Sequence, residues 1–432
     1  MSDPQPERPQ NWAGNVTFTP DHVDRPGSVE ELQDLVARSS KVGTLGTGHS
    51  FNRIADSPGS LVSVAGLPRV LEVSADRASV TVSAGLRYGE VATYLHGEGL
   101  ALHNLGSLPH ISVAGACATG THGSGDGNGI LATAVSAFEQ VTADGSVLRL
   151  ARSDGERFRG AVVGLGALGV VTSVTLDVQP AFDMRQTVYE DLPYAELGAH
   201  FDEVVGAAYS VSLFTDWQGD SIGQVWRKHR VDAQDASWRA ERTWLGATLA
   251  ASPHHPLPGL AGDMCTQQLG VRGPWFERLP HFRLEFTPSF GDELQSEYLL
   301  PREHAVDAVR AVAGLRELLG PVLLVSEIRT VAADDLWLSP AYGRDSVAFH
   351  FTWIKDPAAV AKVLPPLEQG LAPFRARPHW GKLFTTSRNV LLDVYPRLRD
   401  LARLAAELDP LGKCRNDFLD DVLGGDAQTV SG

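Results

Sequence analysis

The feature that most constrains this chain is a glycine-rich stretch near its start, Gly43-Thr44-Leu45-Gly46-Thr47-Gly48-His49-Ser50-Phe51. Closely spaced glycines let a backbone turn sharply and approach a ligand, because no Cβ stands in the way. Successive N–H groups in such a loop can hold a diphosphate. The histidine adds a nucleophilic ring nitrogen that a phosphate loop does not need. Taken alone, the stretch also fits a glycine-rich turn with a solvated histidine.

A second stretch, Ser107 to Gly125, consists almost entirely of small residues from Ser112 onwards. Such residues fill a core poorly but allow a ligand to lie close to the backbone. Val113 and the two histidines, His110 and His122, make the stretch less polar than typical flexible linkers. We interpret it as a structured loop that lines a ligand, with a linker as the alternative.

Length and composition exclude several classes of protein. A chain of 432 residues is too long for one ordinary core and indicates two or three domains. Its 37 basic and 52 acidic residues give a net charge of −15, which argues against a nucleic-acid partner. The three cysteines, Cys117, Cys265 and Cys414, form neither a disulfide framework nor a zinc pattern, so we expect no metal site.

The first ten residues are polar and contain no apolar signal-peptide core. No run of about 18 apolar residues is present to span a membrane. We therefore expect a cytoplasmic protein without a membrane segment.

Helix and strand patterns alternate over residues 20–100, which predicts an α/β or α+β domain. Ser28 and Glu31 have the spacing of a capping box, so a helix is expected to begin there. The other expected elements of this block are strands at 62–64, 79–83 and 170–178, a helix at 88–95 and a hairpin at Asp144-Gly145.

A change in composition near Pro180 predicts a domain boundary. Beyond it we expect strands at 211–217, 224–226, 281–287, 322–330 and 346–354, and helices at 302–319 and 398–408. Residues 230–262 show no sustained period and receive no assignment. The polar tail after Leu423 is expected to be disordered.

Common catalytic motifs are absent. The glycine loop matches the first two glycines of a dinucleotide fingerprint but has Phe51 at the third. There is no P-loop lysine, no G-x-S-x-G elbow and no H-E-x-x-H zinc motif.

Polar residues on two predicted strands are candidates for chemistry. Glu327 and Arg329 are two positions apart, so their side chains project from the same face. They would either be a solvent-facing charge pair or line the floor of a pocket. His350 and Thr352 share one face of the next strand. Lys382 lies among aromatic and glycine neighbours rather than in a charged run.

Together these stretches resemble the bacterial FAD-dependent alditol (xylitol) oxidases, of the vanillyl-alcohol-oxidase (VAO/PCMH) type of flavoprotein. The similarity runs from Asn11 to about Phe418. Its most specific pieces are Gly46-Thr47-Gly48-His49-Ser50-Phe51-Asn52, Ser107 to Gly115, Ala118 to Gly125, Glu327 to Ala332 and Pro378-His379-Trp380-Gly381-Lys382.

The resemblance implies an FAD attached covalently to His49 through the 8α carbon of the flavin. The residues implied to hold the rest of the cofactor are Thr44, Leu45, Gly46, Thr47, Gly48, Ser50, Ser107, Ser112, Gly115, Thr119, Gly120, Thr121, His122 and Val171. The substrate groups implied are Ser107, Glu327, Arg329, Thr352 and Lys382, and we add His350.

As a hypothesis, Arg329 and Lys382 lower the effective pKa of the alcohol and stabilise the anionic reduced flavin. Glu327 would bind a neighbouring hydroxyl. Two residues depart from the family pattern. Gly106 replaces an alanine beside the flavin, which should widen a path for oxygen. Cys414 replaces an aromatic residue, which should alter packing near the cofactor.

The fold implied is α+β with two domains. An FAD-binding domain spans residues 1–181 and is completed by 382–432, and an antiparallel-sheet substrate domain spans 182–381. The expected reaction is oxidation of the terminal primary alcohol of xylitol or sorbitol to the aldose, with O2 reduced to hydrogen peroxide. We expect a monomer. A sugar-lactone oxidase or dehydrogenase of the same fold is the alternative, followed by a non-catalytic sugar- or nucleotide-binding protein.

Overall fold

The first helix forms where the capping box predicts it. In the computed structural model, which describes residues 8–231, 238–286 and 291–424, α1 spans Val29–Arg38. The Ser28 hydroxyl accepts a hydrogen bond from the N–H of Glu31 at 3.2 Å, which satisfies one of the free donors of the first turn. The helix leads directly into β1 (Val42–Thr44) and the glycine loop.

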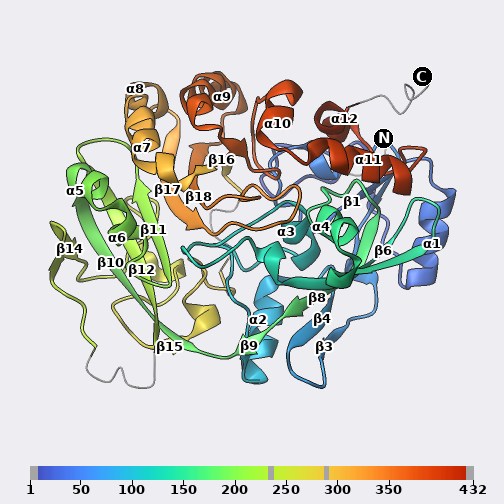
Figure 1. Ribbon diagram of the computed structural model, residues 1–432, viewed down its shortest axis with the longest axis horizontal. Helices are drawn as coiled ribbons and strands as arrows, with labels where there is room; N and C mark the ends of the chain where they lie inside the picture. The colour runs from blue at the N-terminus through green and yellow to red at the C-terminus, as the bar shows by residue number, and fades with distance from the viewer. Residues whose placement is uncertain (1–7, 232–237, 287–290, 425–432) are drawn as a thin grey trace, which may run out of the picture.

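The N-terminal lobe is built on a five-stranded antiparallel sheet with the strand order β3-β4-β8-β6-β7 (Figure 1). Its strands are β3 (Leu71–Val73), β4 (Ser79–Ser83), β6 (Val135–Val141), β7 (Val147–Ala151) and β8 (Val170–Asp177). Two small pairs accompany it: parallel β1 with β2 (Ser60–Val62), and antiparallel β5 (Leu100–Ala101) with β9 (Gln179–Pro180). The helices of this lobe are α1, α2 (Tyr88–Gly97), α3 (Val113–Ala118) and α4 (Glu156–Val162).

The second lobe contains a ten-stranded antiparallel sheet with the order β13-β14-β10-β12-β11-β17-β18-β16-β19, and β15 pairs with β10. Its strands are β10 (Asp183–Pro193), β11 (Ser210–Thr215), β12 (Ser221–Val231), β13 (Thr243–Trp244), β14 (Ala247–Leu249), β15 (Gly273–Pro274), β16 (Glu293–Pro301), β17 (Leu323–Val331), β18 (Ser346–Ile354) and β19 (Arg377–Pro378).

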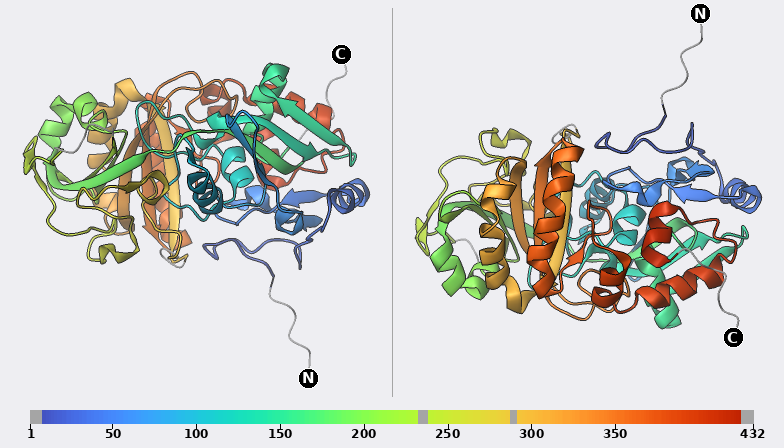
Figure 2. Two further views of the ribbon diagram at one scale, coloured as in Figure 1. Left: turned by 90° about the horizontal axis from the view of Figure 1, so that it is seen from below. Right: turned by 90° about the horizontal axis from the view of Figure 1, so that it is seen from above.

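The two faces of this large sheet differ in character. Ile328, Phe349 and Phe351 point to one face, where they belong to an apolar core shared with the helices. Those helices, which Figure 2 shows along one side of the sheet, are α5 (Tyr194–Ala199), α6 (Phe201–Val205), α7 (Ala305–Ala313), α8 (Arg316–Leu319) and α9 (Pro357–Leu371). Alternate residues such as Glu327 and His350 point to the other face, toward the N-terminal lobe.

Three expected elements differ from the structure. Residues 281–286 form no strand and contribute a single bridge at Phe282, because carbonyl and side-chain contacts hold this segment instead of a ladder. Thr287 lies outside the described residues. The expected helix at 302–319 divides into a 3-10 turn at Arg302–His304, α7 and α8, with Gly314 at the break between α7 and α8. The strand expected at 62–64 is β2, two residues earlier.

The end of the chain returns to the N-terminal lobe. After the second sheet come α10 (Arg388–Val394), α11 (Leu398–Leu408) and α12 (Asp417–Leu423), drawn in red beside the blue and teal segments in Figure 2. The amide of Asn416 donates to the carbonyls of Arg53, Ile54 and Asp56, with Asp56 at 2.7 Å. The tail from residue 425 lies outside the described residues. None of the described helices has the length and apolar character needed to cross a bilayer.

Candidate active site

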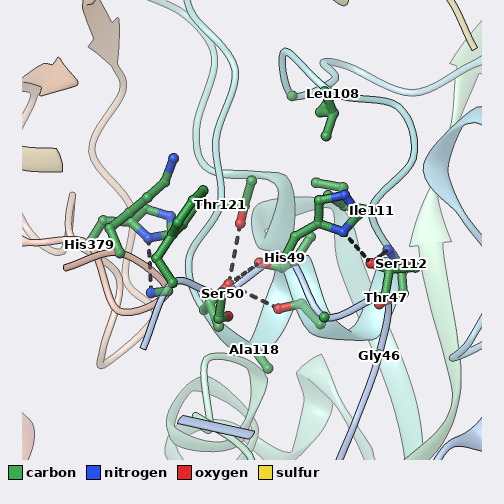
Figure 3. Close-up of a pocket in the computed structure, with 18 of the residues that line it drawn as sticks. Gly46, Thr47, His49, Ser50, Leu108, Ile111, Ser112, Ala118, Thr121 and His379 are labelled. Carbon is green, nitrogen blue, oxygen red and sulfur yellow. Dashed lines mark hydrogen bonds between the residues drawn. The ribbon is translucent and has the colours of Figure 1, made fainter. Parts of the chain in front are cut away.

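A cavity of about 640 Å³ lies between the two lobes and reaches from the glycine loop to the polar face of β17 and β18. One wall is the loop that follows β1, and the opposite end is formed by side chains of the large sheet. Figure 3 shows the wall formed by Gly46, Thr47 and His49, with Ser112 and Thr121 beside it. Both unusual stretches of the sequence therefore line the same cavity.

The glycine loop lies too close to its neighbour for a side chain at Gly46. A Cβ there would be 2.4 Å from the hydroxyl oxygen of Ser112, and Gly48 adopts a positive φ of 71°. Among the described residues, the N–H groups of 46–50 donate no hydrogen bond to another backbone group. A loop with free N–H groups beside a cavity fits the diphosphate of a dinucleotide cofactor.

The second stretch is structured, which excludes the linker interpretation. Ser112 is the N-cap residue of α3, and its N–H donates to the hydroxyl of Thr47 at 3.2 Å. A Cβ at Gly115 would lie 2.8 Å from the Ser112 hydroxyl oxygen. The small residues thus let this segment pack directly against the glycine loop.

His49 lies in the cavity wall with its ring stacked on Trp12, at 5.1 Å between ring centroids. Its Nδ1 lies 3.0 Å from the hydroxyl of Thr47 (Figure 3). Burial lowers the pKa of His49 to about 4, and the positive charges of Arg87 and Lys382 act in the same direction. The ring is therefore neutral near pH 7 and retains a nucleophilic nitrogen. The alternative of a solvated histidine in a turn is wrong.

All but one of the residues expected to hold the cofactor line this cavity. Those that do are Thr44, Leu45, Gly46, Thr47, Gly48, His49, Ser50, Ser107, Ser112, Gly115, Thr119, Thr121, His122 and Val171. Gly120 is the exception. A Cβ on it would lie 2.7 Å from Cδ of Pro340, so this glycine faces the protein interior rather than the cavity.

Glu327 and Arg329, from β17, are buried at the far end of the cavity. The Arg329 Nε lies 3.6 Å from Glu327 Oε1, and its Nη1 donates to the Ser107 hydroxyl at 3.2 Å. Burial favours a raised pKa for Glu327, but the charge of Arg329 and the neighbouring His281 outweigh it and lower the pKa. The interpretation of a solvent-facing pair is wrong, because the N-terminal lobe covers this face.

The other expected substrate residues join the same cluster. Nε2 of His350 lies 3.1 Å from the Thr352 hydroxyl, and its Nδ1 lies 3.4 Å from Lys382 Nζ. Lys382 also donates to the side-chain oxygen of Gln295. Burial lowers the pKa of Lys382 to about 8, while the charge of Glu297 opposes that shift.

The sequence reasoning missed Glu297, the carboxylate at the centre of this cluster. Its Oε1 accepts a hydrogen bond from Arg329 Nη2 at 2.5 Å and lies 3.2 Å from His122 Nε2. Its Oε2 lies 3.6 Å from Nδ1 of His350 and 3.9 Å from Lys382 Nζ. Burial acts to raise the pKa of Glu297, but the charge of Arg329 first, and then the neighbouring His122 and His350, hold it well below its usual value.

A signal for this residue was present in the sequence. Glu293, Gln295 and Glu297 alternate along β16, so all three side chains share one face, and all three line the cavity. His281 was also missed. It donates from Nε2 to Glu327 Oε1 at 2.7 Å, but it lies in a segment without regular structure, where no period marks it.

No cluster of metal-binding side chains occurs within the described ranges. The three cysteines are all buried and free. Cys414 lines the cavity, as does Gly106, where a Cβ would meet Ile111 Cδ1 and Thr121 Cγ2 at an ordinary 3.7 Å. Both departures from the family pattern therefore lie at the cavity wall.

Comparisons with known proteins agree with this geometry. A family model described as an FAD binding domain matches residues 20–151, and one described as D-arabinono-1,4-lactone oxidase matches residues 291–422. The alditol oxidase of a Streptomyces species is 54% identical over 420 residues, which cover 96% of this chain and 99% of the relative. The L-gulono-1,4-lactone dehydrogenase of Mycobacterium tuberculosis is 30% identical over 434 residues, 96% of this chain and 98% of the relative.

The crystal structure of cholesterol oxidase from B. sterolicum has the same fold, with a TM-score of 0.75 at 15% identity over 96% of both chains. The fold and cavity thus define an FAD-dependent oxidoreductase of the α+β, two-domain VAO/PCMH type. Within that class, the chain belongs to the alditol oxidase family. The expected fold class and family are confirmed.

Proposed function

We propose that this protein is an alditol oxidase that converts the terminal primary alcohol of xylitol or sorbitol to the aldose and reduces O2 to hydrogen peroxide. The carrying observation is one cavity with the glycine loop at one end and, at the other, buried Glu327 and Arg329 with the partly buried Lys382 beside them. The 54% identity to a protein named alditol oxidase supports the same substrate class.

In this proposal residues 1–181 and 382–432 hold the FAD, and 182–381 supply most of the substrate groups. Bound FAD supplies the chemistry of a hydride acceptor that O2 can reoxidise. The N–H groups of 46–50 bind its diphosphate, and the small residues around Ser112 and Gly115 let it lie close to the backbone. His49, neutral and half-buried in the cavity wall, is the residue that attaches the flavin covalently.

The charged residues of the chain orient and polarise the alcohol. Arg329 and Lys382 place two positive charges where negative charge develops on the alcohol oxygen as its proton leaves. Glu327 accepts a hydrogen bond from a neighbouring hydroxyl. Ser107, Thr352 and His350 have hydroxyl or ring nitrogen groups that bind further along the polyol. A substrate with several adjacent hydroxyls uses more of these groups than a simple alcohol does.

Oxygen uptake by the purified holoenzyme tests this function. We expect uptake with stoichiometric peroxide on xylitol and sorbitol, and weaker uptake on glycerol, which reaches fewer polar groups. L-gulono-1,4-lactone is the control, because lactone-acting proteins are relatives of this chain. Uptake on the lactone and not on the polyols would move the assignment to a lactone oxidase.

The covalent link has its own test. We expect the yellow colour to remain with the acid-precipitated protein, and to appear in the supernatant with His49→Ala. His110→Ala is the control, since this second histidine lies outside the main cavity, with Nε2 2.9 Å from the carbonyl of Leu284. Release of flavin from the unmodified protein would contradict attachment at His49.

A further inference from the structure

Lys228 is a lysine buried inside β12, only 1% exposed, and the function proposed above makes no use of it. Its Nζ donates to the carbonyls of Leu279 at 2.5 Å and Pro280 at 3.2 Å. The third neighbour is His281 Nδ1 at 3.0 Å. Three acceptors match the three N–H groups of an ammonium, so the lysine is held in one orientation.

This contact and the Glu327 carboxylate require the same nitrogen of His281 to carry hydrogen. An ammonium has no lone pair, so Nδ1 must accept from Lys228 and the ring proton lies on Nε2. From there it donates to Glu327 Oε1 at 2.7 Å. Phe214 and Trp226 pack edge-on against the ring, with centroids 5.4 and 5.2 Å away. Burial lowers the pKa of His281 to about 4, and the charge of Lys228 adds to that, so the ring is neutral.

The proton position on His281 affects the cavity through the hydrogen bond to Glu327. Its Oε1 accepts from His281 and faces Arg329 Nε, whereas its Oε2 accepts no hydrogen bond from the described residues. We propose that Lys228 and His281 are positioning residues, which hold Glu327 with Oε1 occupied and present Oε2 to a hydroxyl of the substrate. The role of Oε2 rests on the proposed function; the proton position on His281 does not.

The proton position is tested first, without substrate, by ¹⁵N NMR of the histidine-labelled holoenzyme. His281 is assigned by the signal lost in His281→Gln. Burial lowers the pKa of Lys228 to about 7, although Glu327 opposes this, so spectra are recorded near roughly pH 6, where the ammonium prevails. We expect a neutral ring protonated at Nε2. A ring protonated at Nδ1, or at both nitrogens, would overturn the proposal.

Two matched variants separate the hydrogen bond from burial. Lys228→Gln keeps an N–H donor for Nδ1, while Lys228→Met has similar length and no donor. We expect Lys228→Gln to keep the neutral ring protonated at Nε2. We expect Lys228→Met to show a fraction of rings protonated at both nitrogens, because Nδ1 is then free to bind a proton while Nε2–H still donates to Glu327. Equal spectra for the two variants would contradict the proposal. If Lys228→Met fails to fold, the Lys228→Gln spectrum and the wild-type spectrum still decide it.

Kinetics then test whether the pair acts through Glu327. Losing one hydrogen bond to a charged group corresponds to a loss of about tenfold in kcat/KM for Lys228→Met, and Lys228→Gln should recover most of it. In a Glu327→Gln background, Lys228→Met should cause no further loss. Arg278→Met is the control, since Arg278 is also buried and donates to carbonyls. We expect Arg278→Met to lower kcat/KM by the same factor with and without Glu327→Gln. If Lys228→Met also lowers kcat/KM by the same factor in both backgrounds, the positioning role is overturned.

Discussion

Lys382 is a cavity residue whose charge changes slightly above neutral pH. Burial lowers its pKa to about 8, so the ammonium is present below that value and is lost above it. We expect kcat/KM of the wild type to fall as the pH rises through about 8, because the positive charge that we propose stabilises the alcohol oxygen disappears.

Lys382→Met should reduce kcat/KM at neutral pH by roughly 10²-fold and abolish the fall at high pH. The measurement is a pH series of kcat/KM with xylitol. Lys355→Met is the control, since Lys355 is partly exposed and pairs with Asp292. An unchanged high-pH fall in Lys382→Met would assign that titration to another group.

A second prediction at the scale of one residue concerns Gly106, where the absence of a Cβ leaves space at the cavity wall. A Cβ there would meet Ile111 and Thr121 at 3.7 Å, so Gly106→Ala should fold without strain. We expect it to slow reoxidation by O2 severalfold, since the added methyl narrows the path past the cavity wall, while turnover with a dye acceptor stays within a factor of about two. Equal rates with O2 in both proteins would show that this position does not limit oxygen.

At the scale of elements, the glycine loop depends on its fit against α3. Gly46→Ala would bring a Cβ to 2.4 Å from the Ser112 hydroxyl oxygen, so one segment must move. We expect a loss of about 1–3 kcal/mol in stability and of most bound flavin, read from the ratio of absorbance at the flavin and protein bands. Gly97→Ala is the control, because nothing lies within 4 Å of a Cβ there. Full flavin content in Gly46→Ala would show that flavin binding does not depend on the close packing of the glycine loop against α3.

Regular elements were the part of the fold that sequence could predict. The alternation along 346–354 predicts that His350 and Thr352 share one face, and the structure agrees. Alternation cannot say which face is covered, because that depends on a lobe distant in sequence. For that reason the sequence alone is compatible with both a solvent-facing and a pocket interpretation of Glu327 and Arg329.

The residues that the sequence analysis did not single out were missed for different reasons. Glu297 lies on a strand whose alternating polar residues are visible in the sequence, so it could have been predicted. His281 and Lys228 were not, since one lies in an irregular segment and the other is a lone lysine in a strand. Their role follows from the contact of Lys228 with His281 and of His281 with Glu327, and contacts between separate segments are a property of the folded chain.

At the scale of the whole molecule, Asn416 joins the end of the chain to its beginning. Its amide donates to the carbonyls of Arg53, Ile54 and Asp56, and its Oδ1 accepts from the N–H of Leu419 at the start of α12. Asn416→Ala should lower stability by about 2–3 kcal/mol, from a lost helix cap and unpaired carbonyls.

Urea unfolding of the holoenzyme, followed by flavin fluorescence and by circular dichroism, measures this loss. Leu411→Ala is the control, because Leu411 is 80% exposed and should change stability by less than about 0.5 kcal/mol. An Asn416→Ala midpoint equal to that of the control would mean that the terminal helices hold without this residue.

The same return of the chain dictates when the protein can acquire its cofactor. Cys414, Asn416 and Leu419 line the cavity beside residues of the glycine loop, so the walls come from the two ends of the sequence. A ribosome makes the loop first and these residues last. During synthesis the cavity therefore lacks part of its wall until residues 414–419 have been made, and full enclosure of the FAD has to follow the synthesis of these residues.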